Sequence, residues 1–461
     1  MSRSVTMTGE LVRALVAARY EDIPEAARQI ARQVCLDGIA VTIAGLREPL
    51  GLGGVALTYT QQLGGTPEST VIGGGFKTSA YNAAYVNGTL CHALDFDNTW
   101  WPLNHPTSPT LPAILALAER DGLSGTEVIT AIVLAFEVQG RMRVASARVE
   151  PGTTFHKPGV SGMMGATTGA GKLLGLDERA FCRAFGIAGS RAGSMSANTG
   201  TMTKASHSGH AARMGIESAS LAALGWTAHE DIFELGGFFE LFYGPGYYDL
   251  DLFLKDFGNP YRMIDPGVGF KKYPCNYFTH RPIDAAIELQ EKYDLMLKDI
   301  AEVEIDFPRV EYVSRPAPKT GLDGKFSVQY TTAAALLDRT ITIDTFSDQR
   351  RFAPDIEALL PRVRVNIRDD IPKEFQSTWA IVRVRTIAGR TSEVRCDRPR
   401  GMWGVPLTRE ERLAKFRDCV EPALPPADVD RLIELIERLD ELPGVEPIMT
   451  VAGRAQGLRG E

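Results

Sequence analysis

The spacing of hydrophobic residues changes twice along this 461-residue chain, and this change constrains the fold more than any other feature of the sequence. From about residue 8 to residue 240, apolar residues recur every three or four positions, as in amphipathic helices. Between about residues 300 and 396 they alternate with polar residues, as in half-buried strands, and helical spacing returns after about residue 404. The sequence therefore predicts a mainly α fold with a smaller α+β unit inserted before the C-terminal helices.

A glycine- and proline-rich stretch at residues 244–270 separates the helical part from the mixed part. We place the domain boundaries accordingly: a large all-helical domain at 1–265 and 402–461, and a smaller α+β domain at 266–401. The C-terminal helices are expected to rejoin the first domain.

Local signals mark where individual helices begin. Residues 124–127 and 408–411 each start with Ser or Thr and end with Glu, which is the spacing of a capping box. A further helix is expected to begin at Leu111 and to hold Pro112 in its first turn, where the missing amide costs nothing. Three segments of the α+β part alternate in the manner of strands, and they carry Val303, Ile305 and Phe307; Val363, Val365 and Ile367; and Ala380, Val382 and Val384.

Composition narrows the class of partner and the compartment. The formal net charge is -7, whereas nucleic acids and anionic membranes attract proteins with a basic face, so we predict neither as a partner. The six cysteines are widely spaced and form no CxxC pair, which is typical of a reducing compartment. Because no signal peptide and no run of about 18 apolar residues is found, we expect a cytoplasmic protein.

The segment "CHALDFDNTWWPLNHP", residues 91–106, is the strongest candidate site. Its prolines favour a loop between two helices, and loops held by rigid helices often carry functional residues. A lone Asp or His would usually be a helix cap or a surface residue. Together, however, Asp95, Thr99 and His105 among bulky aromatic rings can supply acid/base chemistry. A metal is a weaker alternative, since no HExxH and no spaced Cys/His set occurs, and we predict none.

Further histidines and lysines stand at other turns and at the expected domain boundary. They are His156 in "FHKPGV", Lys204 and His207 in "MTKASHSGHAAR", and Lys271 and His280 in "GFKKYPCNYFTH". Taken alone, the cations of "MTKASHSGHAAR" are equally well explained as a solvated helix start. As a set in an acidic protein, they suit a small polycarboxylate substrate bound in a cleft.

Other common site types do not fit. "GATTGAGKL" resembles a phosphate-binding loop, but its glycine is one residue out of register and Leu173 follows Lys172 where Ser or Thr is required. The spacing also misses the dinucleotide fingerprint, so close helix packing is the better explanation. No GxSxG elbow is present for a serine hydrolase. We therefore predict no cofactor.

Five motifs occur in the order found in the MmgE/PrpD family, which the chain resembles from about residue 10 to residue 445. They are "NGTLCHALDFDNTWWPLNHP", "FHKPGV", "MTKASHSGHAAR", "GFKKYPC" with a following "TH", and "FSVQYTTAAALL". The family includes 2-methylcitrate dehydratases, cis-aconitate decarboxylases and iminodisuccinate epimerases. The resemblance implies a helical domain built from both chain ends, an inserted α+β lid domain and a homodimer.

The resemblance also implies roles for individual residues. Asp95, Thr99, His105, His156 and Tyr330 would be catalytic, and Lys204 and Lys271 would hold substrate carboxylates. His207 and His280, singled out from the residues alone, are predicted to bind substrate beside them. Tyr330 enters only through the family motif; from its own surroundings in the sequence it is a helix-packing residue. His105 and His156 would transfer protons, and Asp95 would orient an imidazole or act as the base.

The predicted activity is a cofactor-independent lyase that abstracts a proton next to a carboxylate. Asn98, Trp101 and Asn276 depart from the decarboxylase pattern. A hydro-lyase acting on a 2-methylcitrate-like acid is therefore placed first, a cis-aconitate decarboxylase second and an iminodisuccinate epimerase third. From another class, a polycarboxylate-binding protein without catalysis is the alternative.

Overall fold

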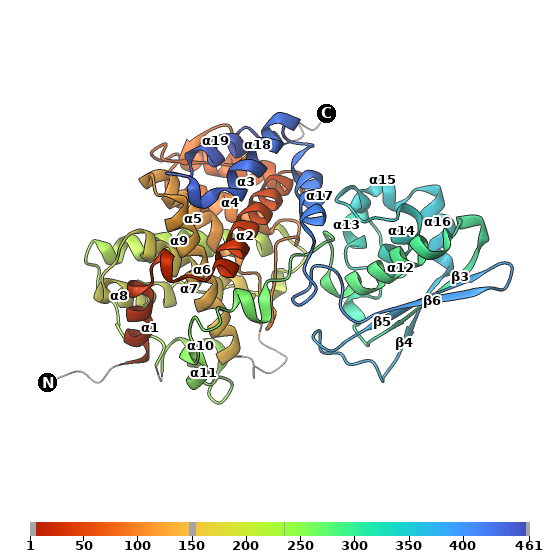
Figure 1. Cartoon of the computed structure of the whole chain (residues 1–461), viewed down its shortest axis with the longest axis horizontal. Helices are drawn as coiled ribbons and strands as arrows, with labels where there is room; N and C mark the ends of the chain where they lie inside the picture. Colours follow the sequence, from red (N-terminus) through yellow and green to blue (C-terminus); the bar gives the residue numbers. More distant parts are fainter. Residues whose placement is uncertain (1–5, 147–153, 235, 458–461) are drawn as a thin grey trace. The chain divides into compact units, whose positions relative to one another are not determined.

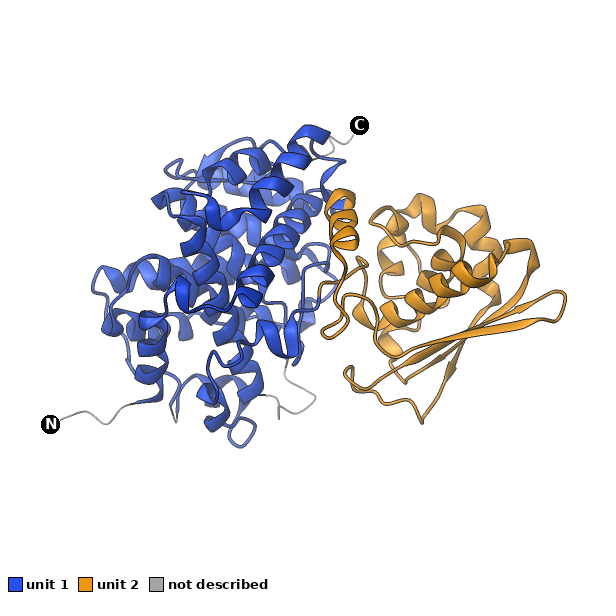
Figure 2. Cartoon of the chain, in the orientation of Figure 1, with its two compact units in different colours: residues 1–269, 419–461 blue, residues 270–418 orange. Residues whose placement is uncertain are grey.

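The computed structural model describes residues 6–146, 154–234 and 236–457. The chain divides into two compact units, of which the first comprises residues 1–269 and 419–461 and the second residues 270–418 (Figure 2). The fold is mainly α, as predicted, and strands gather in the second unit (Figure 1). No helix among the described residues combines the length and the apolar character that crossing a membrane requires.

Helices from both chain ends build the first unit (Figure 1). A two-stranded ribbon, β1 (Ser69–Thr70) and β2 (Lys77–Thr78), was not predicted, because two residues are too few to show a period. The helices are α1 (Met7–Ala17), α2 (Glu25–Gly45), α3 (Leu52–Leu63), α4 (Ala80–His92), α5 (Thr107–Asp121), α6 (Gly125–Ala145), α7 (Ser161–Leu173), α8 (Glu178–Gly189), α9 (Met202–Ala223), α10 (Phe238–Tyr243), α11 (Asp251–Leu254), α18 (Pro426–Glu437) and α19 (Glu446–Gly453).

The helix starts show where local signals are sufficient. The Ser124 hydroxyl accepts from the Glu127 amide, and the Glu127 carboxylate accepts from the Ser124 amide, so the predicted capping box of α6 is confirmed. The predicted start of α5 at Leu111 is wrong, because α5 begins at Thr107. The physical reason is that amides in a first helical turn have no helical partner, so Pro109 is tolerated there; Pro112 then lies inside the helix.

Small residues let α4, α5, α7 and α9 pack closely at the centre of the first unit. A methyl group added at Gly88 of α4 would lie 2.9 Å from the Gly209 Cα of α9, and one added at Gly215 would lie 2.4 Å from the Ala166 Cβ of α7. The close helix packing predicted for "GATTGAGKL", residues 165–173, is therefore confirmed. These small-residue faces are occupied within the unit.

The second unit packs helices against a four-stranded sheet. Its strand order is β4-β3-β5-β6; β3 pairs with β4 in parallel and with β5 in antiparallel orientation, and β5 and β6 form a hairpin. The elements are α12 (His280–Tyr293), β3 (Ile300–Phe307), α13 (Gly321–Gly324), α14 (Val328–Asp338), α15 (Asp348–Arg351), α16 (Pro354–Leu359), β4 (Val363–Ile367), β5 (Ala380–Thr386), β6 (Thr391–Cys396) and α17 (Arg409–Val420), whose last two residues belong to the first unit.

The alternation predicted for the strands holds in the sheet centre and fails at its edge. All apolar residues predicted to face the core are buried in β3 and β5. In the edge strand β4, however, Val365 is half-buried and Ile367 is exposed, because an edge strand has a neighbour on one side alone. The second predicted capping box is confirmed, since Thr408 and Glu411 exchange bonds at the start of α17.

Candidate active site

The predicted loop connects α4 to α5 at residues 93–106 of the first unit. Asp95 has a left-handed backbone with a φ of 53°, a conformation that Asp tolerates better than most residues, and this turn follows the end of α4. The loop is braced by two backbone bonds between Thr99 and Gly269. The Thr99 hydroxyl donates to the Asn104 carbonyl at 2.7 Å, so it closes the loop upon itself.

Asp95 lies beside a lysine and an imidazole. Its Oδ1 accepts a hydrogen bond from Lys204 Nζ at 2.8 Å and lies 3.7 Å from His105 Nε2. All three side chains are about one-fifth exposed, so the cluster is open enough for a small molecule to reach. A carboxylate, an ammonium and an imidazole at these distances can bind an anion and transfer a proton.

A second carboxylate, Asp97, holds two imidazoles. Its Oδ1 lies 2.9 Å from His92 Nδ1 and 3.1 Å from His105 Nδ1. Burial by itself would raise the pKa of Asp97, but the two adjacent histidines hold that pKa well below its ordinary value. Burial is also the main cause that lowers the pKa of His92 to about 4, although Asp97 opposes it. At neutral pH Asp97 is therefore ionised and His92 is neutral.

Four of the seven histidines stand in a row. The ring centroids of His105 and His92 are 4.8 Å apart, those of His92 and His156 are 5.2 Å apart, and those of His156 and His207 are 5.3 Å apart. His156 Nδ1 and His207 Nδ1 are within hydrogen-bonding distance at 3.2 Å. Burial, followed by His92 and Lys204, lowers the pKa of His156, and burial also lowers that of His207. Such perturbed groups gather at functional sites.

Helix packing brings these distant residues together. Helix α4 ends at His92, and it packs against α9, which carries Lys204 and His207 near its start. His156 precedes a short 3-10 helix (Lys157–Gly159) that contacts both α7 and α9, and its carbonyl accepts from the Ser194 hydroxyl at 2.6 Å. The close approach of small residues described above therefore sets the geometry of the site.

Six of the nine predicted site residues lie in the first unit. The structure brings Asp95, His105, His156, Lys204 and His207 into one cluster, whereas Thr99 braces the loop through its hydroxyl. The other three, Lys271, His280 and Tyr330, lie in the second unit.

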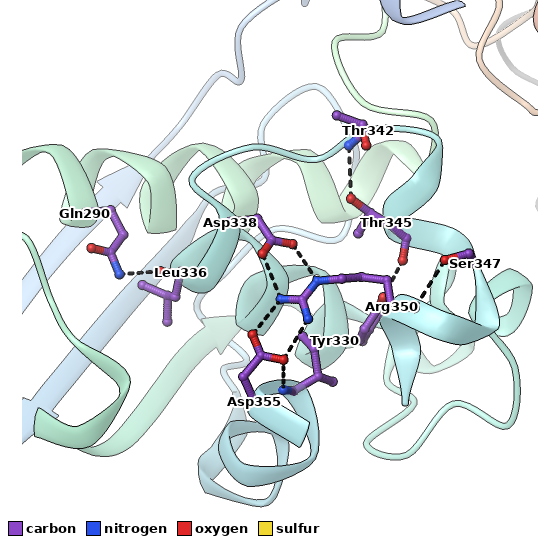
Figure 3. A network of polar contacts seen from close by, with 10 residues as sticks. Gln290, Tyr330, Leu336, Asp338, Thr342, Thr345, Ser347, Arg350 and Asp355 are labelled. Carbon is purple, nitrogen blue, oxygen red and sulfur yellow. Dashed lines mark hydrogen bonds and ion pairs between the residues drawn. The ribbon is translucent and has the colours of Figure 1, made fainter. Parts of the chain in front are cut away.

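Tyr330 belongs to the core of the second unit. Its hydroxyl donates to the Thr345 carbonyl, and its side chain lies beside Arg350, whose guanidinium is bonded to both Asp338 and Asp355 (Figure 3). Burial raises the pKa of Tyr330, so the phenol keeps its proton. The catalytic role predicted for this residue stays a prediction.

Lys271 and His280 are also buried. Lys271 Nζ lies 5.9 Å from the centroid of the Tyr277 ring, and the His280 ring packs edge-on against Tyr273 and Tyr277. Burial, followed by the positive charge of Lys271, holds the pKa of His280 well below its ordinary value. Both residues belong to one polar-aromatic cluster, and their predicted contact with substrate stays a prediction.

The cluster around Asp95 contains residue types that can ligate a metal ion. His92, Asp95 and His105 offer ligand atoms that lie within 4.8 Å of one another. Zinc ligands, about 2.0–2.2 Å from the ion, must approach one another more closely than that. Lys204 also places its ammonium 2.8 Å from the Asp95 carboxylate and would repel a cation. The arrangement suits binding of an anion and proton transfer better.

Comparison with known proteins shows the family of the chain. The MmgE/PrpD N-terminal domain matches residues 9–250, and the MmgE/PrpD C-terminal domain matches residues 273–441. The chain belongs to the MmgE/PrpD family. The resemblance predicted from the five motifs is thereby confirmed.

Curated relatives of this MmgE/PrpD protein are similar over most of their length. The cis-aconitate decarboxylase of Mus musculus is 33% identical over 83% of this chain and 81% of its own, and that of Homo sapiens is 32% identical over 80% and 78%. The cis-aconitate decarboxylase of Aspergillus terreus is 28% identical over 93% of this chain and 92% of its own. Together with the family match, these relatives make the chain an enzyme, a lyase of the MmgE/PrpD type.

Two residues of the site cluster in this MmgE/PrpD protein were not predicted from the sequence. His92 is the last residue of a helix and Asp97 is an ordinary loop residue by pattern, and neither was named as a site residue. A usable signal was present in the spacing, because His92, Asp97 and His105 all fall within one short proline-rich segment. Only the loop conformation shows that Asp97, rather than Asp95, makes the closer contact with His105.

Proposed function

We propose that this lyase removes carbon dioxide from cis-aconitate or a closely similar unsaturated tricarboxylate. The observation that carries the proposal is the similarity to cis-aconitate decarboxylases over about four-fifths of both chains. The cluster of Asp95, Lys204 and His105 supports it, because it combines a cation for a substrate carboxylate with a group that transfers protons.

Lys204 would hold a substrate carboxylate. Its ammonium is already oriented by Asp95 at 2.8 Å, which costs the site less reorganisation when an anion arrives. Lys271 is proposed as a second carboxylate ligand on the strength of its family motif. A substrate with three carboxylates needs more than one cation, and the chain as a whole is acidic, so the positive charge must be local.

His105 would supply the proton. When the bond between the carbon and the leaving carboxylate breaks, the electron pair stays on carbon and carbon dioxide departs. A proton must then move from an acid to that carbon, and His105 regains one proton from solvent for each turnover. His156 is the second proposed proton-transfer residue; with its pKa lowered, it enters the reaction as a neutral imidazole.

The decarboxylase thus takes precedence over the 2-methylcitrate dehydratase that the sequence placed first. That order depended on Asn98, Trp101 and Asn276. Asn276 serves as a helix cap, since its side chain accepts a hydrogen bond from the Phe278 amide, and Asn98 is buried. The use of Asn276 as a helix cap makes this position weak evidence about what leaves the substrate.

Proton NMR in D₂O of the chelator-treated enzyme tests the proposal. With cis-aconitate we expect carbon dioxide release and one carbon-bound deuterium in the product. With 2-methylcitrate as the parallel substrate, formation of an alkene without carbon dioxide would instead support the dehydratase. Activity that requires an added metal would contradict the assignment of the cluster to metal-free proton transfer.

Replacing His105 with Gln tests the proposed acid. We expect kcat to fall by about 10²-fold or more, because general acid catalysis contributes about that much. His229→Gln is a matched control, since His229 is exposed and its ring accepts a hydrogen bond from the nearby Asp231 amide. Normal turnover in His105→Gln would remove His105 from the mechanism.

We also propose that the enzyme is a homodimer and works in the cytoplasm. All six cysteines lie in described parts of the chain and form no disulfide with one another, and five of them are buried, which supports a reducing compartment. The dimer proposal follows from family membership.

A further inference from the structure

One carboxylate oxygen of Asp97 lies between two imidazoles. His92 Nδ1 forms a hydrogen bond with Asp97 Oδ1 at 2.9 Å, and His105 Nδ1 lies 3.1 Å from the same oxygen. Asp97 and His92 are both fully buried, whereas His105 reaches the edge of the cluster. His92 and Asp97 therefore lie on the buried side of His105, the residue proposed to deliver the proton.

The protonation of these groups follows from their contacts. Asp97 is ionised, so it accepts hydrogen bonds and cannot donate them. His92 Nδ1, which shares the hydrogen bond with this oxygen, must then carry a proton, and a carboxylate oxygen at 3.1 Å favours a proton on His105 Nδ1 as well. In a neutral imidazole protonated at Nδ1 the other nitrogen, Nε2, is unprotonated, and in His105 this is the nitrogen that lies 3.7 Å from Asp95 Oδ1.

We propose that Asp97 is a shared positioning residue, which fixes the orientation and tautomer of His92 and His105 so that His105 exchanges its proton through Nε2. His92 buttresses Asp97 from the buried side. The inference rests on the proposed function in one respect, because His105 is taken as the proton donor.

Asp95 is the competing carboxylate, and its contacts differ. Its Oδ1 accepts from Lys204 Nζ at 2.8 Å and lies 3.7 Å from His105 Nε2, beyond a direct hydrogen bond. The Lys204 ammonium thus balances the charge of Asp95. Asp97 is the better partner for an imidazolium, and it stabilises that charged form of His105 while the proton is held there.

Asp97→Asn is the most informative variant, because it keeps the shape of the Asp97 side chain and removes its negative charge. An amide can also donate to Nδ1, which forces the proton of a neutral imidazole onto Nε2. We expect kcat to fall by about 10³-fold, with KM changed less than about threefold since Asp97 does not touch substrate. Asp37→Asn in α2 is the control for loss of a buried carboxylate elsewhere in the unit, and it should leave kcat unchanged.

Nitrogen-15 NMR of the imidazole rings gives a readout that does not depend on activity. With seven histidines in the chain, single replacements can assign each signal. Wild-type His92 and His105 should show the tautomer protonated at Nδ1 when neutral, and Asp97→Asn should shift His105 toward the other tautomer.

The two proposals fail in different ways. Protonation of wild-type His92 or His105 at Nε2 alone would overturn the positioning role, even if Asp97→Asn does not fold. So would wild-type kcat in a folded Asp97→Asn. If the expected tautomers are found but cis-aconitate is never turned over, the positioning role stands and the proposed substrate is wrong.

Discussion

At the scale of single residues, two aspartates separated by one position have different partners. Asp95 pairs with an ammonium and Asp97 with two imidazoles, because the left-handed turn at Asp95 sends the two side chains to different neighbours. Two acids that are close in the sequence therefore lie in different electrostatic environments.

The stability of the first unit should depend on pH through His92. The pKa of a histidine is about 6.5 in the unfolded chain, whereas that of folded His92 is about 4. Between these values the unfolded chain binds a proton that the folded chain does not, so stability is lost as the pH falls from 6.5 to 4. The loss from His92 is on the order of 3 kcal/mol.

Denaturant unfolding of wild type and His92→Asn at several pH values checks this prediction. The free energy of unfolding of the variant should fall less steeply below pH 6.5, by up to about 1.4 kcal/mol per pH unit. The groups that surround His92, namely Asp97, His105, His156 and Lys204, are present in both proteins. Identical slopes would show that His92 is not held neutral.

Lys204 provides a second test at the residue scale. Lys204→Met should raise KM at least about tenfold, because one charge-assisted hydrogen bond to a substrate carboxylate is lost. Lys172→Met is the comparison: Lys172 Nζ bonds the carbonyls of Leu15, Val16 and Ala18, so its loss should affect stability alone. An unchanged KM in Lys204→Met would exclude Lys204 as a carboxylate ligand.

At the scale of elements, contact between α4 and α9 holds the site together. A methyl group at Gly209 of α9 would lie 2.2 Å from the Tyr85 carbonyl and from Thr89 Oγ1 in α4, so the helices must move apart to admit it. Helix α9 carries Lys204 and α4 ends at His92, which means that such a shift would alter the site.

Gly209→Ala should therefore reduce both stability and activity. Overpacking costs about 1–3 kcal/mol, and kcat should fall as well. Gly54→Ala in α3 is the matched control, because Gly54 is exposed with no atom within 4 Å of the added methyl, and it should stabilise by about 0.5–1 kcal/mol. Thermal unfolding with steady-state kinetics measures both; equal effects of the two changes would contradict the packing argument.

At the scale of the whole molecule, the second unit contributes three predicted site residues. Lys271→Met should raise KM if Lys271 binds a substrate carboxylate, whereas a change in melting temperature alone would assign it to packing.

Tyr330→Phe removes the bond to the Thr345 carbonyl and should destabilise the protein by about 1–3 kcal/mol. A fall in its kcat beyond that expected from the unfolded fraction would support the predicted catalytic role.

The molecular mass in solution tests the proposed homodimer. Light scattering should give about twice the 50.3 kDa of one chain if the protein is a homodimer. A mass near that of a single chain, at concentrations used for kinetics, would contradict the dimer.

The sequence by itself determined the class of fold and the main loop of the site. Helical and alternating spacings are local properties, so they predicted a mainly α chain with a mixed part, and the prolines after α4 predicted a loop. Residues 95–105 stay close in any fold because the chain joins them. Family motifs added Tyr330, which no local pattern marks as catalytic. Local patterns failed where position in the fold decides the outcome, as at the edge strand β4 and the start of α5.

Only the tertiary structure decided which groups meet. Lys204 bonds Asp95 across 109 positions, and His156 meets His207 across 51. These contacts exist because small residues let α4, α7 and α9 approach closely and fix their rotation. The same packing buried His92 and Asp97 behind His105. Hydrophobic spacing cannot specify such pairings, since it fixes which face of a helix is buried but not the residue that lies opposite.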